Sequence, residues 1–394
     1  MTVDPRDLRR LLIRLFLVTL VVRAVLLYSV DFSGGEVAAA RGLAANGRAM
    51  PAAQAPAAAW SVFAGVEPGI LRLPSMVIDS AAVVLAVLFT RAAGWGTIAG
   101  LMAAIALALA PFGMYEGFRL DGGALLGALG LIGLLGTRAG LSQGRRLPLL
   151  GAAAAFAALG ALSPAAAIAV LGALLMVARS VAQSSLRLVA FAATGFAAFG
   201  GALLRWQWTG RRLPGLDLVS DWLVDAGTSG EPMAFADAGL GAFAEAIATL
   251  SASGPYGGTA TLLEIPAARM WTLAPALLLW LVAAWGLFRG QVQADPPLHV
   301  GQAAAEEDGA GAADGWRSLG VGAHHAVPRM LGDRDWGPLC VMVAAAALWT
   351  AIAAHLGRAT GVNEALSIAR PAAALLLGLG LAAAARPRSL DPRR

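Results

Sequence analysis

Two carboxylates stand directly after the first long apolar run of this chain, in the stretch "DFSGGEVAAARGLAANG" at residues 31–47. They are Asp31 and Glu36, and the flexible pair Gly34-Gly35 lies between them. A carboxylate near a membrane surface can take the proton from an acceptor hydroxyl or amide. Either acid could therefore serve as a general base.

A second group of charges follows in "PFGMYEGFRLDGG", which contains Glu116, Arg119 and Asp121. Arg358 and Arg370 border the last two apolar runs. A planar guanidinium matches phosphate oxygens bidentately, so Arg119, Arg358 and Arg370 are candidates for binding a phosphate. A charge at membrane depth costs several kcal/mol unless it is paired or faces water, so such residues mark function by default.

Outward carboxylates combined with outward arginines suit two chemistries. The first is glycosyl transfer from a sugar carried on a lipid phosphate, in which a carboxylate acts as the base and arginines hold the departing phosphate. The second is transport, which predicts symmetry-related broken helices and charges near the membrane midplane. Here the charges gather at one face, and the long loop 206–267 has no inverted counterpart, which favours the enzyme. A non-catalytic membrane scaffold is the third alternative.

Other charges within or beside the apolar runs are expected to be structural. Asp79 interrupts the run "SMVIDSAAV" and is expected to pair with another residue of the helix bundle. Arg205, Arg211 and Arg212 open the long loop, where they are expected to reach the membrane interface or to form ion pairs.

The composition excludes several classes of protein. The 394 residues are 58% hydrophobic and only 13% charged, which is typical of a membrane protein. Every basic residue is arginine, so the chain has neither a P-loop lysine nor a Schiff-base lysine, which excludes an ATP-driven pump and a PLP enzyme. The single cysteine, Cys340, cannot form an intramolecular disulfide. No basic run is interleaved with aromatic residues, so no nucleic-acid partner is expected.

The charges are positioned by about ten apolar runs, each of a length that crosses roughly 30 Å of hydrocarbon. The runs predict an all-α, polytopic integral membrane protein. The first run continues into acids without a small-residue cleavage site, so it is expected to be a retained helix rather than a signal peptide. The predicted spans lie near residues 11–30, 72–90, 95–112, 119–137, 147–162, 164–180, 187–205, 268–288, 337–356 and 366–385.

Arginines at alternate ends of these runs predict the orientation. If the basic ends face inward, both termini are cytoplasmic in a bacterial cytoplasmic membrane, and the first loop, 31–71, is outside. The loop 206–267 is also outside, and its amphipathic stretches are expected to lie on the membrane or cover a cavity. Residues 290–336 are expected to form a flexible cytoplasmic loop. The chain thus divides into a module at 1–205, the outer loop, and C-terminal helices at 268–394.

The order of motifs resembles a known family. An apolar helix and an acid-bearing loop are followed by "AARGLAANG", "PAAQAPAAAW", "RLPSMVIDSAAVVLAVLFTR", "ALAPFGMYEGFRLDG" and "AALGALSPAAAIAVL". Across residues 8–205 this resembles the GT-C superfamily of membrane glycosyltransferases, which includes protein mannosyltransferases and bacterial enzymes that use polyprenyl-phosphate sugars. The chain departs from that pattern at "FSGGE", where an acid pair is often seen, and at "LSPAA", where a Lys-Pro is common.

The resemblance implies an inverting, mannosyltransferase-like transfer from a polyprenyl-phosphate donor to a lipid, glycan or protein acceptor of the cell envelope. Asp31 lies near the family's catalytic acid and is slightly favoured over Glu36 as the base, while Asp121 would bind the acceptor or orient the sugar. The donor phosphate would be bound by Arg119, Arg358 and Arg370. Nothing visible requires a metal, although the acids could hold a divalent ion. A catalytically inactive GT-C-like scaffold is the alternative within this resemblance.

Overall fold

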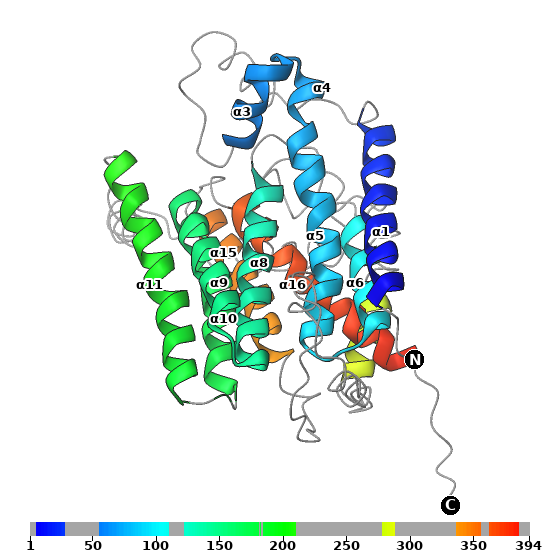
Figure 1. Cartoon of the computed structure of the whole chain (residues 1–394), viewed down its shortest axis with the longest axis vertical. Helices are drawn as coiled ribbons and strands as arrows, with labels where there is room; N and C mark the ends of the chain where they lie inside the picture. The colour runs from blue at the N-terminus through cyan, green and yellow to red at the C-terminus, as the bar shows by residue number, and fades with distance from the viewer. Residues whose placement is uncertain are drawn as a thin grey trace, which may run out of the picture.

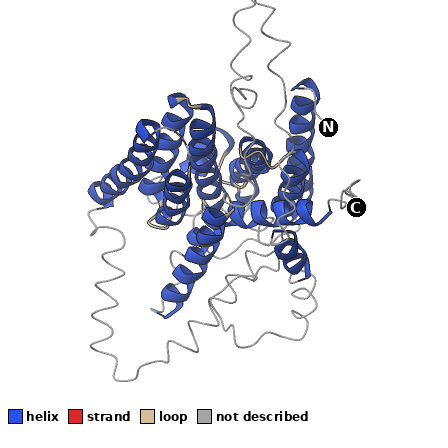
Figure 2. Cartoon of the chain, turned by 90° about the horizontal axis from the view of Figure 1, so that it is seen from below, coloured by secondary structure: helices blue, strands red, loops and turns tan. Residues whose placement is uncertain are grey.

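All of the regular structure that can be described in this chain is α-helical (Figure 2). The structure is a computed structural model, and it describes residues 5–27, 55–109, 122–180, 182, 184–209, 278–287, 336–355 and 362–385. The helices are α1 (Pro5–Leu26), α3 (Ala55–Ala64), α4 (Pro68–Leu71), α5 (Leu73–Ala92), α6 (Thr97–Leu109), α8 (Gly123–Gln143), α9 (Arg146–Leu162), α10 (Ala166–Arg179), α11 (Ser184–Thr209), the helix Leu278–Leu287, α15 (Gly337–His355) and α16 (Val362–Ala385).

Helix ends follow local chemistry. α5 has a proline in its first turn, where a missing N–H costs nothing. α8 ends at Gly144, which adopts a left-handed φ of 67° that glycine reaches without strain. A tight turn at Ser163-Pro164 separates the predicted spans 147–162 and 164–180, because α9 ends at Leu162 and α10 begins at Ala166.

Four of the described helices are long and apolar enough to cross a membrane. They are Gly69–Ala92, Gly123–Gln143, Ser184–Arg205 and Glu364–Ala385. This length and composition support the prediction of a membrane protein. Each of the ten predicted runs overlaps a described helix, but the count of ten spans and the covering outer loop stay predictions.

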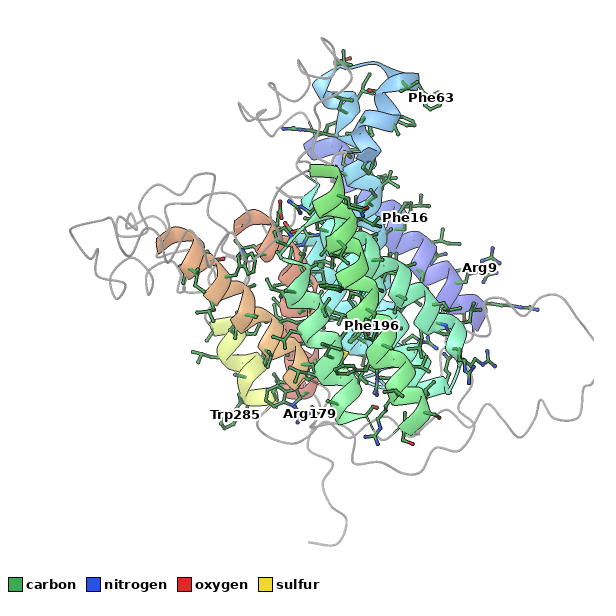
Figure 3. The ribbon with its side chains drawn as sticks, turned by 90° about the vertical axis from the view of Figure 1, so that its left-hand side faces the viewer. Arg9, Phe16, Phe63, Arg179, Phe196 and Trp285 are labelled. Atoms are coloured by element: carbon green, nitrogen blue, oxygen red, sulfur yellow. The ribbon has the colours of Figure 1, made fainter. Side chains whose placement is uncertain are left out.

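Helix α16 lies at the centre of the bundle and α11 at its edge (Figure 1). The apolar stretch of α16 is 83% buried, and α16 packs against α6, α8 and α15, whereas the stretch of α11 is 17% buried. We call the "α4 end" the end of the bundle where α1 finishes, α5 begins, and α3 and α4 lie (Figure 1). Figure 3 places Phe63 at the α4 end, and Arg179 and Trp285 near the opposite end.

The interface between α9 and α11 depends on glycine. A Cβ atom on Gly201 would overlap the backbone carbonyl of Ala157, and one on Gly160 would overlap that of Ala198. The two backbones therefore approach closely, as small residues allow between membrane helices. Gly200, next in sequence to Gly201, has no atom within 4 Å of the same position.

This contrast gives a matched pair of substitutions. Gly201→Ala should lower the free energy of unfolding by about 1–3 kcal/mol, because the added methyl group forces α9 and α11 apart. Gly200→Ala should be neutral or should raise it by up to about 1 kcal/mol, since alanine favours the helix and meets nothing. Thermal unfolding of the two variants in the same detergent measures both effects. Equal shifts would contradict the close packing.

Candidate functional site

A carboxylate buried at the α4 end contacts two arginines from other helices. Asp79 of α5 accepts a hydrogen bond at Oδ1 from Nη2 of Arg370 in α16 and forms an ion pair at Oδ2 with Nη2 of Arg23 in α1. The three side chains are 0%, 4% and 1% exposed respectively, so all are removed from solvent. We call them the Arg23–Asp79–Arg370 cluster. The prediction that Asp79 pairs within the bundle is confirmed.

Helix α1 brings Arg23 to Asp79 by packing along α5. Leu27 and Met76 form a small apolar cluster between the two helices. Nη1 of Arg23 donates to Oγ of Ser80 at 3.3 Å, and Nη1 of Arg72 donates to the Leu27 carbonyl at 3.4 Å. Arg23 is therefore held at two sides, and the end of α1 is tied to the start of α5.

Helix α16 brings Arg370 to Asp79 from the other side. A Cβ on Gly127 of α8 would lie 2.8 Å from the carbonyl oxygen of Ser367, so only glycine permits this approach of α8 to α16. Pro371 has no N–H to offer that carbonyl within the helix. Arg370 thus stands on a tightly packed turn that a proline interrupts.

Among the described residues, several arginines lie close to one carboxylate. Two guanidinium groups meet one carboxylate, and Arg72, only 1% exposed, adds a third cation at the same end. Nε of Arg23 is buried and has no hydrogen-bond partner among the described residues. Burying a charge costs several kcal/mol unless it is paired, so groups of buried charges mark candidate functional sites.

Two further polar contacts involve the turn between α9 and α10. Oγ of Ser163 donates to Oε2 of Glu364 in the first turn of α16 and accepts the Ala165 N–H at 3.1 Å. Nη1 of Arg205 donates to the Leu162 carbonyl at 2.6 Å, which ties α11 to the end of α9. These contacts fasten α9, α10, α11 and α16 together around the turn at Ser163.

Arg370 is the only one of the predicted site residues that falls within the described part of the chain. Asp31, Glu36, Arg119, Asp121 and Arg358 lie outside the described residues. The role predicted for Asp121 therefore stays a prediction, and the described part of the fourth predicted span is α8. This helix begins at Gly123, and its N-cap is Gly122 with a φ of 86°. Whether Arg370 also binds a phosphate stays a prediction.

No protein-family model, curated protein or solved structure matches this chain. The candidate site therefore rests on its own residues, and membership of the GT-C superfamily is carried into the proposal below.

The sequence analysis overlooked Arg23 and Arg72. Arg23 interrupts the first apolar run in the same way as Asp79 interrupts the second, and that signal could have identified it. Arg72 was read as the edge of a span. Within the described helices, no group of three or more His, Cys, Asp or Glu side chains could hold a metal ion.

Proposed function

We propose that this protein is an inverting membrane glycosyltransferase of the GT-C type, which moves a sugar from a polyprenyl-phosphate donor to an acceptor on the extracytoplasmic face. The observation that carries the proposal is that two buried arginines from different helices, Arg23 and Arg370, come together at Asp79 inside the bundle. A phosphate whose lipid tail stays in the bilayer is an anion that can reach such a place. Guanidinium groups bind phosphate oxygens with good geometry.

The distribution of exposed arginines supports an extracytoplasmic location for the α4 end. At the opposite end, the described residues include many exposed or half-buried arginines, whereas Asp7 is the acid that lies among them in α1. Cytoplasmic ends of membrane helices carry such an excess of arginine. The arginines at that end are Arg6, Arg9, Arg10, Arg14, Arg91, Arg138, Arg145, Arg146, Arg179 and Arg187.

The acids proposed for catalysis are close in the sequence to helix ends that lie at the α4 end. Asp31 follows Leu27, the last described residue after α1, by four residues, and Asp121 directly precedes Gly122, the N-cap of α8. In this proposal Asp31 or Glu36 is the general base, and Asp121 binds the acceptor or orients the sugar.

The proposed reaction is a single displacement. The base removes the proton from the acceptor, whose oxygen or nitrogen then attacks the anomeric carbon as the bond from that carbon to the phosphate oxygen breaks. The electron pair of that bond stays on the phosphate, which gains a second negative charge. Arginines stabilise this developing charge more than they stabilise the intact donor, and such a difference accelerates a reaction. Arg119, Arg358 and Arg370 are proposed for this role.

A carboxylate buried between arginines is also found in transporters, so transport is the second candidate. Reconstituted vesicles with a labelled polyprenyl-phosphate sugar separate the two. A transferase passes the label to an acceptor and releases one polyprenyl phosphate for each sugar, whereas a transporter moves the label across the bilayer without this by-product. A scaffold does neither, and then the proposed function fails.

A further inference from the structure

Helix α3 presents large apolar side chains to the outside of the molecule at the α4 end. Phe63 is 86% exposed, Val62 is 79% exposed and Trp60 is 40% exposed, and Phe63 points away from the bundle (Figure 3). The sequence of α3, APAAAWSVFA, contains no charged residue. A helix that is apolar on all sides belongs in a protein core or in a membrane, and the exposure of Phe63 excludes the core.

The two sides of α3 show that its outward face has no need of water. The side toward the bundle includes Ala57, which is 3% exposed, and Ser61. The Ser61 hydroxyl donates to the Ala58 carbonyl at 2.7 Å, so this polar group is satisfied within the helix. The opposite side carries Val62 and Phe63, where a helix on a water-exposed surface has polar or charged residues.

The length and the position of α3 place it at the boundary of the bilayer. Its 10 residues extend over about 15 Å, which is roughly half of the hydrocarbon thickness, so α3 is too short to span. It packs against α4 and α5 where α5 begins (Figure 1). The candidate span Gly69–Ala92 starts within five residues of the end of α3 and is about 36 Å long, enough to cross the hydrocarbon. The start of this span, and α3 beside it, therefore lie where hydrocarbon meets head groups.

We propose that α3 is a membrane-inserted anchor whose partner is the surface of the lipid bilayer. Val62 and Phe63 enter the hydrocarbon of the leaflet at the α4 end, and Trp60 lies at the level of the head groups, where tryptophan is enriched in membrane proteins. Because the first turns of α5 contact α3, the bilayer that surrounds α5 also reaches α3. The anchor fixes the C-terminal part of the first loop, 31–71, to the membrane, whether or not the chain transfers a sugar.

Site-directed spin labelling measures this insertion in the full chain. The single cysteine is removed by Cys340→Ala, and a nitroxide is attached in the Phe63→Cys variant, reconstituted in vesicles of phosphatidylethanolamine and phosphatidylglycerol. Glu67→Cys is the matched control, because Glu67 is also exposed at the α4 end but is charged. Oxygen dissolves in hydrocarbon, whereas a polar nickel chelate stays in water. The ratio of oxygen to nickel collision rates should be about tenfold higher or more at position 63 than at position 67.

Two other results would overturn the inference. Equal ratios at the two positions, with free access of the nickel chelate, mean that α3 faces water. Low collision rates of both reagents at position 63 mean that protein covers this face. In that case, broadening of the spectrum by a second nearby label identifies the cover as a second copy of the chain, and its absence identifies another part of the same chain.

Photochemical cross-linking provides a second test if the chain with Cys340→Ala does not fold. p-Benzoylphenylalanine in place of Phe63 should become attached to radiolabelled phosphatidylglycerol on illumination, and in place of Glu67 it should not. The exposure of Phe63 means that the larger ring disturbs no packing. Attachment of position 63 to protein alone, or equal attachment of both positions to lipid, overturns the inference. Insertion of α3 in a protein that transfers no sugar would refute the proposed function and leave the anchor intact.

Discussion

Replacing Asp79 by asparagine is expected to lower the free energy of unfolding by about 3–5 kcal/mol, which is the usual result of removing one partner from a buried ion pair. The substitution keeps the shape of the side chain but removes the carboxylate that both Arg23 and Arg370 contact. The apparent Tm in detergent should fall by roughly 4–6 °C. Thermal unfolding followed by tryptophan fluorescence measures this shift.

The stability losses of the arginine variants, compared with that of Asp79→Asn, test whether the balance of charge is the cause. Arg23→Gln or Arg370→Gln leaves one arginine and one carboxylate, so each should cost less than Asp79→Asn. Adding Arg23→Gln to Asp79→Asn should restore part of the lost stability, because the second change removes one of the two arginines that lost their contact with the Asp79 carboxylate. Asp7→Asn is a control: it breaks an ion pair with Arg10 whose side chains are 64% and 73% exposed, and it should change stability by no more than about 0.5 kcal/mol. Equal losses for Asp79→Asn and Arg23→Gln would show that the charge balance is not what holds the cluster.

Neutralising Asp31 and Glu36 together, as Asn and Gln, is expected to slow sugar transfer by about 10²–10⁴-fold, which is the contribution of a general base. The amount of protein in the membrane should not change, because the two replacements keep the size of the side chains. The rate of release of polyprenyl phosphate from the labelled donor measures the effect.

Glu67 offers a matched control for this change. It is an exposed acid before α4, and its side chain makes no capping hydrogen bond, so Glu67→Gln should leave the rate of transfer unchanged. The single variants at Asp31 and Glu36 then show which of the two is the base. Transfer at the natural rate in the double variant would remove both residues from the mechanism.

The positions of the helices could be predicted from the sequence because hydropathy is a local property. The apolar runs at 72–90 and 147–162 correspond to α5 and α9 to within two residues. The start of α16 was placed four residues too late, since Val362 and Glu364 lie outside the apolar run although an acid in the first turn favours a helix. The predicted run that corresponds to α8 begins at residue 119, four residues before the helix itself begins at Gly123.

The partners of the buried charges were much harder to predict. That Asp79 needs a partner follows from the cost of burying a charge, but which partner it has depends on the packing of three helices. Arg370 stands 291 positions from Asp79, and Ser163 stands 201 positions from Glu364. No local pattern connects residues so far apart. The sequence makes Arg370 a candidate for binding a phosphate but does not indicate its carboxylate partner. The structure identifies that partner as Asp79.

The chain order of Arg23, Asp79 and Arg370 has a consequence for biogenesis. A ribosome makes α1 and α5 first, so the hairpin that enters the bilayer early already contains a balanced pair of opposite charges. The 291 positions between Asp79 and Arg370 take roughly 15–60 s to translate. Arg370 therefore reaches Asp79 only after the α1–α5 pair and the helices between α5 and α16 have been made.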